Sequence, residues 1–173
     1  MKNHKSATFV AQAAVIAALY VILTYIASMM GIANGVIQVR FSEMMCILPI
    51  FTPAAVPGLF IGCIISNTIS GCVIWDIIFG SLATLIGAVG TMLLRKVTFR
   101  SVPILSFIPP ILANAIVVPF VLAYAYGVED AIWFMILTVG AGELISVAVF
   151  GGILYAALRK YRSAVFKPDL YTK

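Results

Sequence analysis

Six polar or charged side chains interrupt the long apolar stretches of this sequence, and they carry the chemistry needed to bind a ligand. They are Arg40, Glu43, Asn67, Asp76, Asn114 and Glu143. Ionised carboxylates only accept hydrogen bonds, whereas amides both donate and accept them. Adjacent ring and exocyclic N–H groups can therefore pair with a carboxylate in bidentate fashion. The set predicts a binding site for a flat heterocycle, neutral or cationic, with a guanine-like edge.

Each of these residues also has a purely structural interpretation. Arg40 and Glu43 have the i,i+3 spacing of an ion pair at a helix end, and Asp76 has the place of a solvated carboxylate at a helix N-terminus. Asn67 and Asn114 have the character of interhelical hydrogen-bonding residues. Glu143 is the strongest candidate for a functional role, because a carboxylate near the membrane centre is costly unless it faces a cavity or a partner.

The sequence offers little for enzymatic chemistry. It contains no GxxxxGK[ST], HExxH or GxSxG motif, so P-loop ATP hydrolysis, zinc proteolysis and serine hydrolysis lack their usual residues. Cys46, Cys63 and Cys72 form no CxxC pair, and the only histidine is His4. We therefore expect no catalytic residue, no metal site and no cofactor, and we expect the protein not to be an enzyme.

The composition places these residues in a membrane. Of the 173 residues, 63% are hydrophobic and 10% are charged, against roughly 45–50% and about 25% in a soluble domain. A small soluble globule has too much surface to be covered by so few charges. We expect a single all-α membrane domain over residues 1–173. A nucleic-acid partner is not expected, because the chain lacks a water-exposed basic domain.

Six membrane spans account for the apolar segments. We predict them at about residues 7–30, 39–51, 53–69, 75–94, 102–126 and 131–158. Three prolines at 49, 53 and 57 divide the long uncharged stretch into the second and third spans, because proline breaks or ends helices. The second span is short, since 13 residues at an α-helical rise reach only about 20 Å.

Charge placement supports six spans with both termini in the cytoplasm. All Lys and Arg residues except Arg40 fall in three clusters, at residues 2–5, 95–100 and 159–173. Such clusters face the cytoplasm by the positive-inside rule, and an even number of crossings puts all three on one side. The acidic loop at residues 127–130 then lies outside.

Small residues mark the faces where helices approach one another. Ala7, Ala11, Ala14 and Ala18 follow one face of the first span, and glycines occur at 58 and 62 and at 80, 87 and 90. Internal packing is the expected role of the glycines. The alanine face suits either internal packing or the docking of a separate membrane protein, and the residues alone leave both open.

Several motifs together resemble the QueT family. They are VRFSE at 39–43 followed by Leu48-Pro49, PGLFIGC at 57–63 with Asn67, the highly specific DIIFGSLAT at 76–84, Pro110 with Asn114, and VGAGE at 139–143. The chain departs from the family at Met44-Met45, where a small residue followed by Leu is more usual. Because methionine is adaptable, we expect this change to repack the edge of the site without changing the ligand class.

The resemblance implies a multi-pass protein of the prokaryotic cell membrane that works as the substrate-binding S-component of an energy-coupling factor (ECF) transporter. Its substrate would be a queuosine precursor, a deazaguanine base bound from outside by the six residues above. Its partners would be a transmembrane coupling subunit, docked on the Ala14 and Ala18 face, and two cytoplasmic ATPase subunits. Two other classes stay open, namely a proton-coupled secondary transporter using Glu143 and a structural or channel-forming protein.

Overall fold

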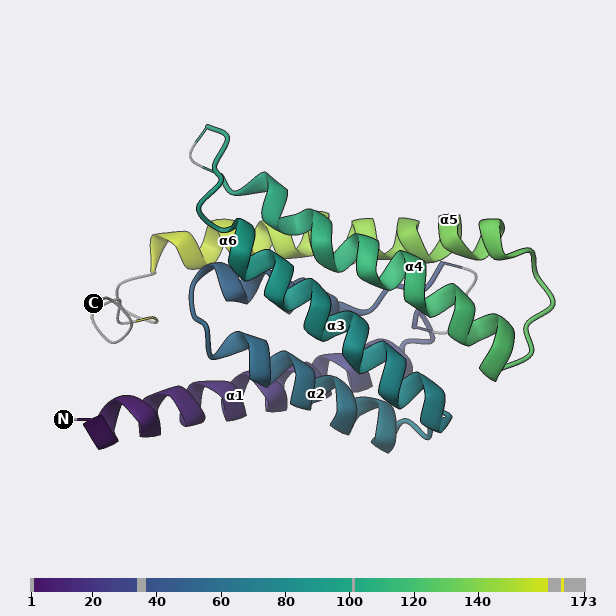
Figure 1. The fold of residues 1–173 in the computed structure, drawn as a ribbon, viewed down its shortest axis with the longest axis horizontal. Helices are drawn as coiled ribbons and strands as arrows, with labels where there is room; N and C mark the ends of the chain where they lie inside the picture. Colours follow the sequence, from purple (N-terminus) through teal and green to yellow (C-terminus); the bar gives the residue numbers. More distant parts are fainter. Residues whose placement is uncertain (1, 34–36, 101, 162–165, 167–173) are drawn as a thin grey trace.

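Helices that run back and forth between two ends of the molecule make up the described part of the chain (Figure 1). The structure is a computed structural model that describes residues 2–33, 37–100, 102–161 and 166, with side chains from Ser6 onward. The elements in chain order are α1 (Lys2–Met29), η1 (Phe41–Ile50), α2 (Ala55–Ile69), α3 (Ile74–Leu94), η2 (Ile104–Phe107), α4 (Ile108–Ala125), α5 (Ile132–Glu143), η3 (Leu144–Phe150) and α6 (Gly151–Lys160). The all-helical membrane architecture expected from the sequence is thus confirmed.

Four helical segments of the described residues are long and apolar enough to cross a membrane. They are Ser6–Met29, Ile74–Leu94, Ile104–Ala125 and Ile132–Lys160, and they match the first, fourth, fifth and sixth predicted spans within a few residues. The second and third predicted spans correspond to η1 and α2, which are shorter apolar helices. In Figure 1 α2 still runs within the bundle between its two ends. Six membrane crossings therefore remain a prediction.

The second predicted span differs most from expectation, because η1 is a 3₁₀ helix of 10 residues. Ser42, Glu43 and residues 45–50 are all buried in it. It contacts α1, α2, α3, η2, η3 and α6. Most of its surface is therefore covered by protein and not by lipid. The larger rise of a 3₁₀ helix, about 2.0 Å per residue, gives it a length of about 20 Å. Burial among these neighbours explains how so short a segment is stable inside the bundle.

Glycines let the neighbouring helices approach at van der Waals distance. A Cβ added at Gly58 of α2 would lie 2.7 Å from the Ala13 carbonyl oxygen of α1, and one at Gly62 would lie 2.9 Å from Cβ of Tyr20. Gly87 and Gly90 of α3 face Pro110 and Pro109 in the same way. Interfaces of small residues are the usual means of close packing between membrane helices. The expected packing role of these glycines is confirmed.

The last long segment changes helical type at the candidate site residue. α5 ends at Glu143, and the next seven residues form the π-helix η3 before α6 continues to Lys160. A π-helical insertion adds a residue to the turn and re-aims the side chains around it, which is why such insertions gather at functional sites. Glu143 therefore lies at the junction between the α-helix and the π-helix.

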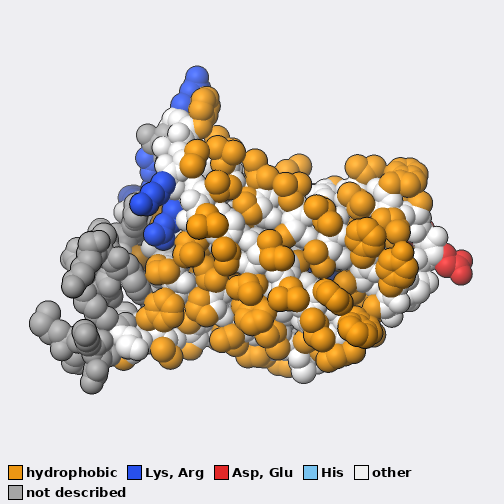
Figure 2. All heavy atoms as spheres, in the orientation of Figure 1, with side chains coloured by type: hydrophobic (Ala, Val, Ile, Leu, Met, Phe, Trp, Pro, Cys, Tyr) orange, Lys and Arg blue, Asp and Glu red, His pale blue; other side chains and the backbone are white. Residues whose placement is uncertain are grey.

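The exposed charged residues gather at the two ends of the bundle. Figure 2 shows Lys and Arg side chains at one end and acidic side chains at the opposite one. α1 begins and α6 ends at the basic end, where the α3–α4 connection also lies (Figure 1). Arg162, Lys167 and Lys173 of the predicted third cluster lie outside the described residues, as do the side chains of Lys2 and Lys5. The start of α1 and the end of α6 lie on one side, which agrees with the expected even number of membrane crossings. Their cytoplasmic location stays a prediction.

Candidate functional site

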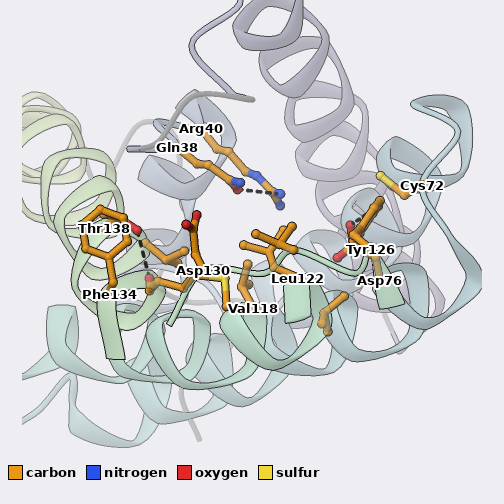
Figure 3. Close-up of a pocket in the computed structure, with 14 residues that line it drawn as sticks. Gln38, Arg40, Cys72, Asp76, Val118, Leu122, Tyr126, Asp130, Phe134 and Thr138 are labelled. Carbon is orange, nitrogen blue, oxygen red and sulfur yellow. Dashed lines mark hydrogen bonds between the residues drawn. The ribbon is translucent and has the colours of Figure 1, made fainter. Parts of the chain in front are cut away.

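A pocket of about 450 Å³ opens at the end of the bundle opposite the basic residues (Figure 3). Its volume falls in the range that holds small organic ligands. Apolar walls come mainly from α4 and α5, and polar groups come from the segment before η1, from α3 and from the α4–α5 connection. The lining residues with polar side chains are Gln38, Arg40, Cys72, Asp76, Tyr126, Asp130 and Thr138.

Asp76 presents a fixed carboxylate to this pocket. It lies in the first turn of α3, where the helix dipole favours a negative charge, and it is only 5% exposed. The Tyr126 hydroxyl donates a hydrogen bond of 2.9 Å to its Oδ2 atom. Tyr126 therefore positions the carboxylate. The interpretation of Asp76 as a solvated carboxylate is wrong, because neighbouring side chains cover it.

Asn67 contacts the backbone of Asp76. Its Nδ2 atom donates to the Asp76 carbonyl oxygen at 3.5 Å, and both side chains surround Gly80, where an added Cβ would lie 3.1 Å from Asp76 Oδ1 and 3.3 Å from Asn67 Nδ2. Asn67 is 4% exposed and does not line the pocket. It acts through Asp76 in this arrangement, by holding the start of α3 against α2.

Arg40 is the basic side chain of the site. It extends into the pocket beside Gln38, whose Oε1 atom accepts a hydrogen bond of 3.5 Å from the guanidinium (Figure 3). The guanidinium lies within electrostatic range of the Asp76 and Glu43 carboxylates. It is thus placed between the open pocket and the buried residues below.

A second polar layer lies one helical turn below the pocket. Val118 of α4 and Val139 of α5 line the pocket and are buried. Asn114 precedes Val118 by four residues and Glu143 follows Val139 by four, so each lies on the same helix face one turn deeper. Neither Asn114 nor Glu143 lines the pocket. The two valines therefore form a floor between the open pocket and a buried layer.

Glu43 is the centre of the buried layer. It is 2% exposed, and its oxygens accept hydrogen bonds from three different side chains. The Tyr20 hydroxyl of α1 donates to Oε1, while the Cys46 thiol and the Asn114 amide donate to Oε2 at 3.1 and 3.2 Å. Donors to a carboxylate compensate for its removal from water. The Glu43 carboxylate is thus held by α1, η1 and α4 together.

Glu143 has less compensation for its burial. It is 5% exposed, and among the described residues its Oε2 atom has no hydrogen-bond partner. The Glu43 carboxylate is close enough to act on it electrostatically, which for like charges in a low dielectric is unfavourable. A buried acceptor without a partner costs roughly 1–3 kcal/mol. A ligand that supplies an N–H donor or a positive charge would remove this cost.

The six predicted residues are therefore brought into one region but divided between two layers. Arg40 and Asp76 line the open pocket, and Glu43, Asn67, Asn114 and Glu143 lie in or beside the buried layer. In place of the Arg40–Glu43 ion pair that the i,i+3 spacing allowed, the two side chains make the contacts described above. Sequence reasoning missed Tyr20 and Gln38, which lie in apolar or loop sequence with no local feature that sets them apart. The described residues contain no group of three or more His, Cys, Asp or Glu side chains arranged to hold a metal.

Gly142 of α5 makes room for the backbone of the segment that carries Gln38 and Arg40. A Cβ added at Gly142 would lie 2.0 Å from the Gln38 carbonyl oxygen, a distance that no packing tolerates. One turn further along, the Ser146 hydroxyl accepts a hydrogen bond of 3.2 Å from the Arg40 backbone N–H and donates one of 2.9 Å to the Gly142 carbonyl oxygen. Gly142 and Ser146 thus fix how deeply Arg40 enters the pocket.

We expect Gly142→Ala to displace the Gln38–Arg40 segment and to weaken ligand binding by at least about tenfold, which corresponds to about 1.4 kcal/mol. Gly152→Ala is the matched control, because a Cβ at Gly152 meets nothing within 4 Å on the same helical segment. Equilibrium binding and thermal unfolding of both variants are the measurements. Equal affinity of the two variants would show that ligand binding does not depend on the close contact between Gly142 and the Gln38–Arg40 segment.

The comparisons with known proteins agree on one family. The QueT transporter family matches this chain over residues 10–160. The queuosine precursor transporter QueT of Lactococcus lactis subsp. cremoris (strain MG1363) is 41% identical over 83 residues, which cover 47% of this chain and 48% of that relative. The matched part thus spans about half the length of this curated relative. No solved structure matches the chain.

The family match covers nearly all of the helical bundle, including every residue of the two polar layers. Its description as a transporter agrees with a chain whose long apolar helices surround a polar site. The chain is a multi-pass protein of the cell membrane, and it belongs to the QueT transporter family.

Proposed function

We propose that this chain is the substrate-binding S-component of an ECF transporter and that it captures a queuosine precursor from outside the cell. The observation that carries the proposal is the pocket above the buried Glu43 and Glu143 layer, in a chain of the QueT transporter family. The related Lactococcus lactis protein is named a queuosine precursor transporter. A deazaguanine base is flat and rich in N–H donors, which are the groups that unpaired carboxylate oxygens require.

The pocket has the walls that a flat base needs. Val118, Val121, Met135 and Val139 give it apolar surfaces, and Asp76 and Arg40 stand at its polar side. In the proposal the Asp76 carboxylate accepts N–H groups of the base edge, and Arg40 and Gln38 contact its carbonyl oxygen or ring nitrogen acceptors. The deepest substituent of the base points at the valine floor, beneath which lies the unpartnered Glu143 oxygen.

The balance of charge favours a substrate that carries a positive charge. The described residues of the two layers include three buried carboxylates, Glu43, Asp76 and Glu143, against the one guanidinium of Arg40. Asp130 adds an exposed carboxylate at the pocket. An excess of negative charge is destabilising in a low-dielectric interior unless a cation or a proton balances it. Of the queuosine precursors, the base with an aminomethyl arm supplies such a cation, and we propose that it binds more tightly than the base with a neutral cyano group.

Docking to the coupling subunit is assigned to the outer face of α1. Ala13 and Ala17 pack against Gly58 and Gly62 of α2, which leaves Ala14 and Ala18 exposed. These two line an apolar groove of about 700 Å³ together with Pro57 and Ile61. Small residues along a groove permit another helix to approach closely. The energy for uptake would come from the two ATPase subunits on the cytoplasmic side.

One observation favours a second candidate function. Two buried carboxylates act on each other electrostatically near the membrane centre, an arrangement found in proton relays of secondary transporters. In that case Glu143 would exchange a proton during uptake, and no ATPase would be required. Measurements of binding and of gradient-driven accumulation separate the two candidates.

Binding of the base can be followed through a native cysteine. Cys72 lines the pocket, whereas Cys46 and Cys63 are buried. Burial raises the pKa of the Cys72 thiol above its usual value, so N-ethylmaleimide labelling is best measured at mildly alkaline pH. At a concentration of the aminomethyl base about ten times its Kd, we expect labelling to slow about tenfold by mass action, with the ATPase partners absent.

Adenine, which lacks the guanine-like edge, is the control and should give no protection of Cys72. Proteoliposomes containing this chain alone complete the test. Protection without accumulation under a proton gradient agrees with an S-component, whereas accumulation driven by the gradient establishes a secondary transporter. Absence of protection by either deazaguanine base would overturn the proposed substrate.

Glu143→Gln tests the buried layer. The substitution keeps size and shape but replaces one acceptor oxygen by a donor NH₂ group. Because the valine floor separates Glu143 from the pocket, its carboxylate acts on the substrate through its charge, and losing that charge should weaken binding of the cationic aminomethyl base more than binding of the neutral cyano base, by about tenfold. Glu129→Gln is the matched control, because Glu129 is exposed at the same end of the molecule and does not line the pocket.

Affinity and melting temperature of the Glu143→Gln variant need to be measured together. An unchanged affinity with an altered melting temperature would make Glu143 a structural residue and leave Asp76 to read the base. A proton-coupled carrier would instead lose accumulation more than it loses binding.

Ala14→Trp tests the docking surface. The indole would fill the groove beside Pro57 and Ile61 without reaching the pocket, so we expect ATP-driven uptake to be lost while base binding stays near normal. Leu112→Trp, on an exposed position of α4, adds the same bulk toward lipid and should leave uptake intact. Loss of base binding in the isolated Ala14→Trp variant would mean that the alanine face serves internal packing.

A further inference from the structure

The connection between α3 and α4 forms a small hairpin that the proposed transport function does not use. Phe99 and Val102 pair across it, with the Phe99 N–H donating to the Val102 carbonyl oxygen at 2.9 Å and the Val102 N–H donating to the Phe99 carbonyl oxygen at 3.0 Å. We call residues 95–100 and 102 the basic hairpin, because Arg95, Lys96 and Arg100 lie in it.

Arg100 adopts a conformation at this tip that its residue type disfavours. Its φ is +48°, the only positive φ among the described residues other than glycine. Tight two-residue turns prefer Gly, Asn or Asp in this region of φ. Glycine would adopt this φ without strain, and residues held in such conformations cluster at functional sites.

Exposed apolar side chains accompany the basic ones. Phe99 is 61% exposed, and Leu93 and Val97 are 70% and 48% exposed. The Arg100 guanidinium lies over the Phe99 ring at 5.7 Å from its centroid. An aromatic ring beside several cations is typical of the membrane–water interface, where rings lie at the headgroup level and cations contact lipid phosphates.

The direction of the hairpin agrees with that location. In Figure 1 it projects sideways from the helices at the basic end of the bundle, and in Figure 2 basic and hydrophobic side chains lie next to each other on the projection. Because the long helices cross the membrane, a sideways projection at their end runs along the membrane surface. A hairpin so placed meets lipid headgroups on its way out from the bundle.

We propose that the basic hairpin is a binding surface for acidic phospholipids. Phe99 enters the boundary between headgroups and acyl chains, and Arg95, Lys96 and Arg100 bind the phosphate groups around it. Each basic residue near an anionic surface adds to the attraction, and the ring adds apolar burial. The surface anchors the inner end of α3 and α4 against the membrane plane, independently of the substrate bound at the other end.

A tryptophan in place of Phe99 reports on this contact. The variant Phe99→Trp, in a chain whose Trp75 and Trp133 are replaced by Phe, is reconstituted in phosphatidylcholine vesicles. One set contains a minor share of brominated phosphatidylglycerol and the other the same share of brominated phosphatidylcholine. We expect quenching by the acidic lipid to be stronger by at least about twofold, because the cations enrich it around the ring.

Two further variants separate lipid binding from a structural role. Arg100→Gly removes the charge and relieves the positive φ, so we expect the melting temperature to hold or rise while the preference for the acidic lipid falls. The pair Arg159→Gln and Lys160→Gln removes exposed charges from the same end of the bundle and should leave the preference unchanged.

Equal quenching by the two brominated lipids would overturn the proposal, as would an unchanged preference in the Arg100→Gly variant. Absence of quenching by both lipids would place Phe99 outside the membrane boundary and would overturn it as well. If quenching were absent and Phe99→Trp emission changed only when the coupling and ATPase subunits were added, the hairpin would be a protein contact and the proposal would equally fail.

Discussion

The rest of the structure depends on the burial of one carboxylate. Glu43 lies on a 3₁₀ helix that protein surrounds, and it has to be compensated in an interior without water. Its donors come from Tyr20 of α1, Cys46 of η1 and Asn114 of α4. These hydrogen bonds connect helices that are distant in sequence. Replacing any one donor leaves the carboxylate undercompensated, so the position of η1 and the packing of its neighbours are coupled.

Close approach of helices is the second condition for this arrangement. The Gly58 and Gly62 contacts bring α2 against α1, and the Gly87 and Gly90 contacts bring α3 against Pro110 and Pro109 of α4. Only at these distances can Tyr20 and Asn114 reach the same carboxylate. On the other side of η1, Gly142 and the π-helix after Glu143 receive the Gln38–Arg40 segment. The buried polar layer therefore depends on the glycines that let the helices approach as much as on the polar side chains themselves.

Capture and energy coupling are physically separated in the proposed function. Substrate recognition belongs to the acidic end, where Asp76 and Arg40 face an open pocket above the valine floor. Docking of the proposed partner belongs to the lateral face of α1, and the basic hairpin lies at the opposite end of the bundle (Figures 1 and 2). Because η1 contacts both α1 and the helices around the pocket, it is the element through which occupancy of the site can act on the docking face.

The sequence by itself determined the membrane class, the long helices and the identity of the polar residues, whereas only the tertiary structure decided how these residues are arranged in space. Apolar runs of sufficient length specify transmembrane helices whatever surrounds them, and charged residues within such runs are few enough to be recognised one by one. Glycine spacing likewise predicted the close contacts of α2 and α3. The motifs around Glu43, Asp76 and Glu143 were sufficient to indicate the family. Residues 41–50, by contrast, form a 3₁₀ helix of which eight residues are buried by other elements, and no local pattern encodes those neighbours. The division into an open and a buried layer follows from how α4 and α5 pack, and Tyr20 became a functional candidate only through its contact with Glu43, 23 residues away in the chain. Local sequence specifies helices through their own hydrogen bonds and hydropathy, but it does not specify which faces meet.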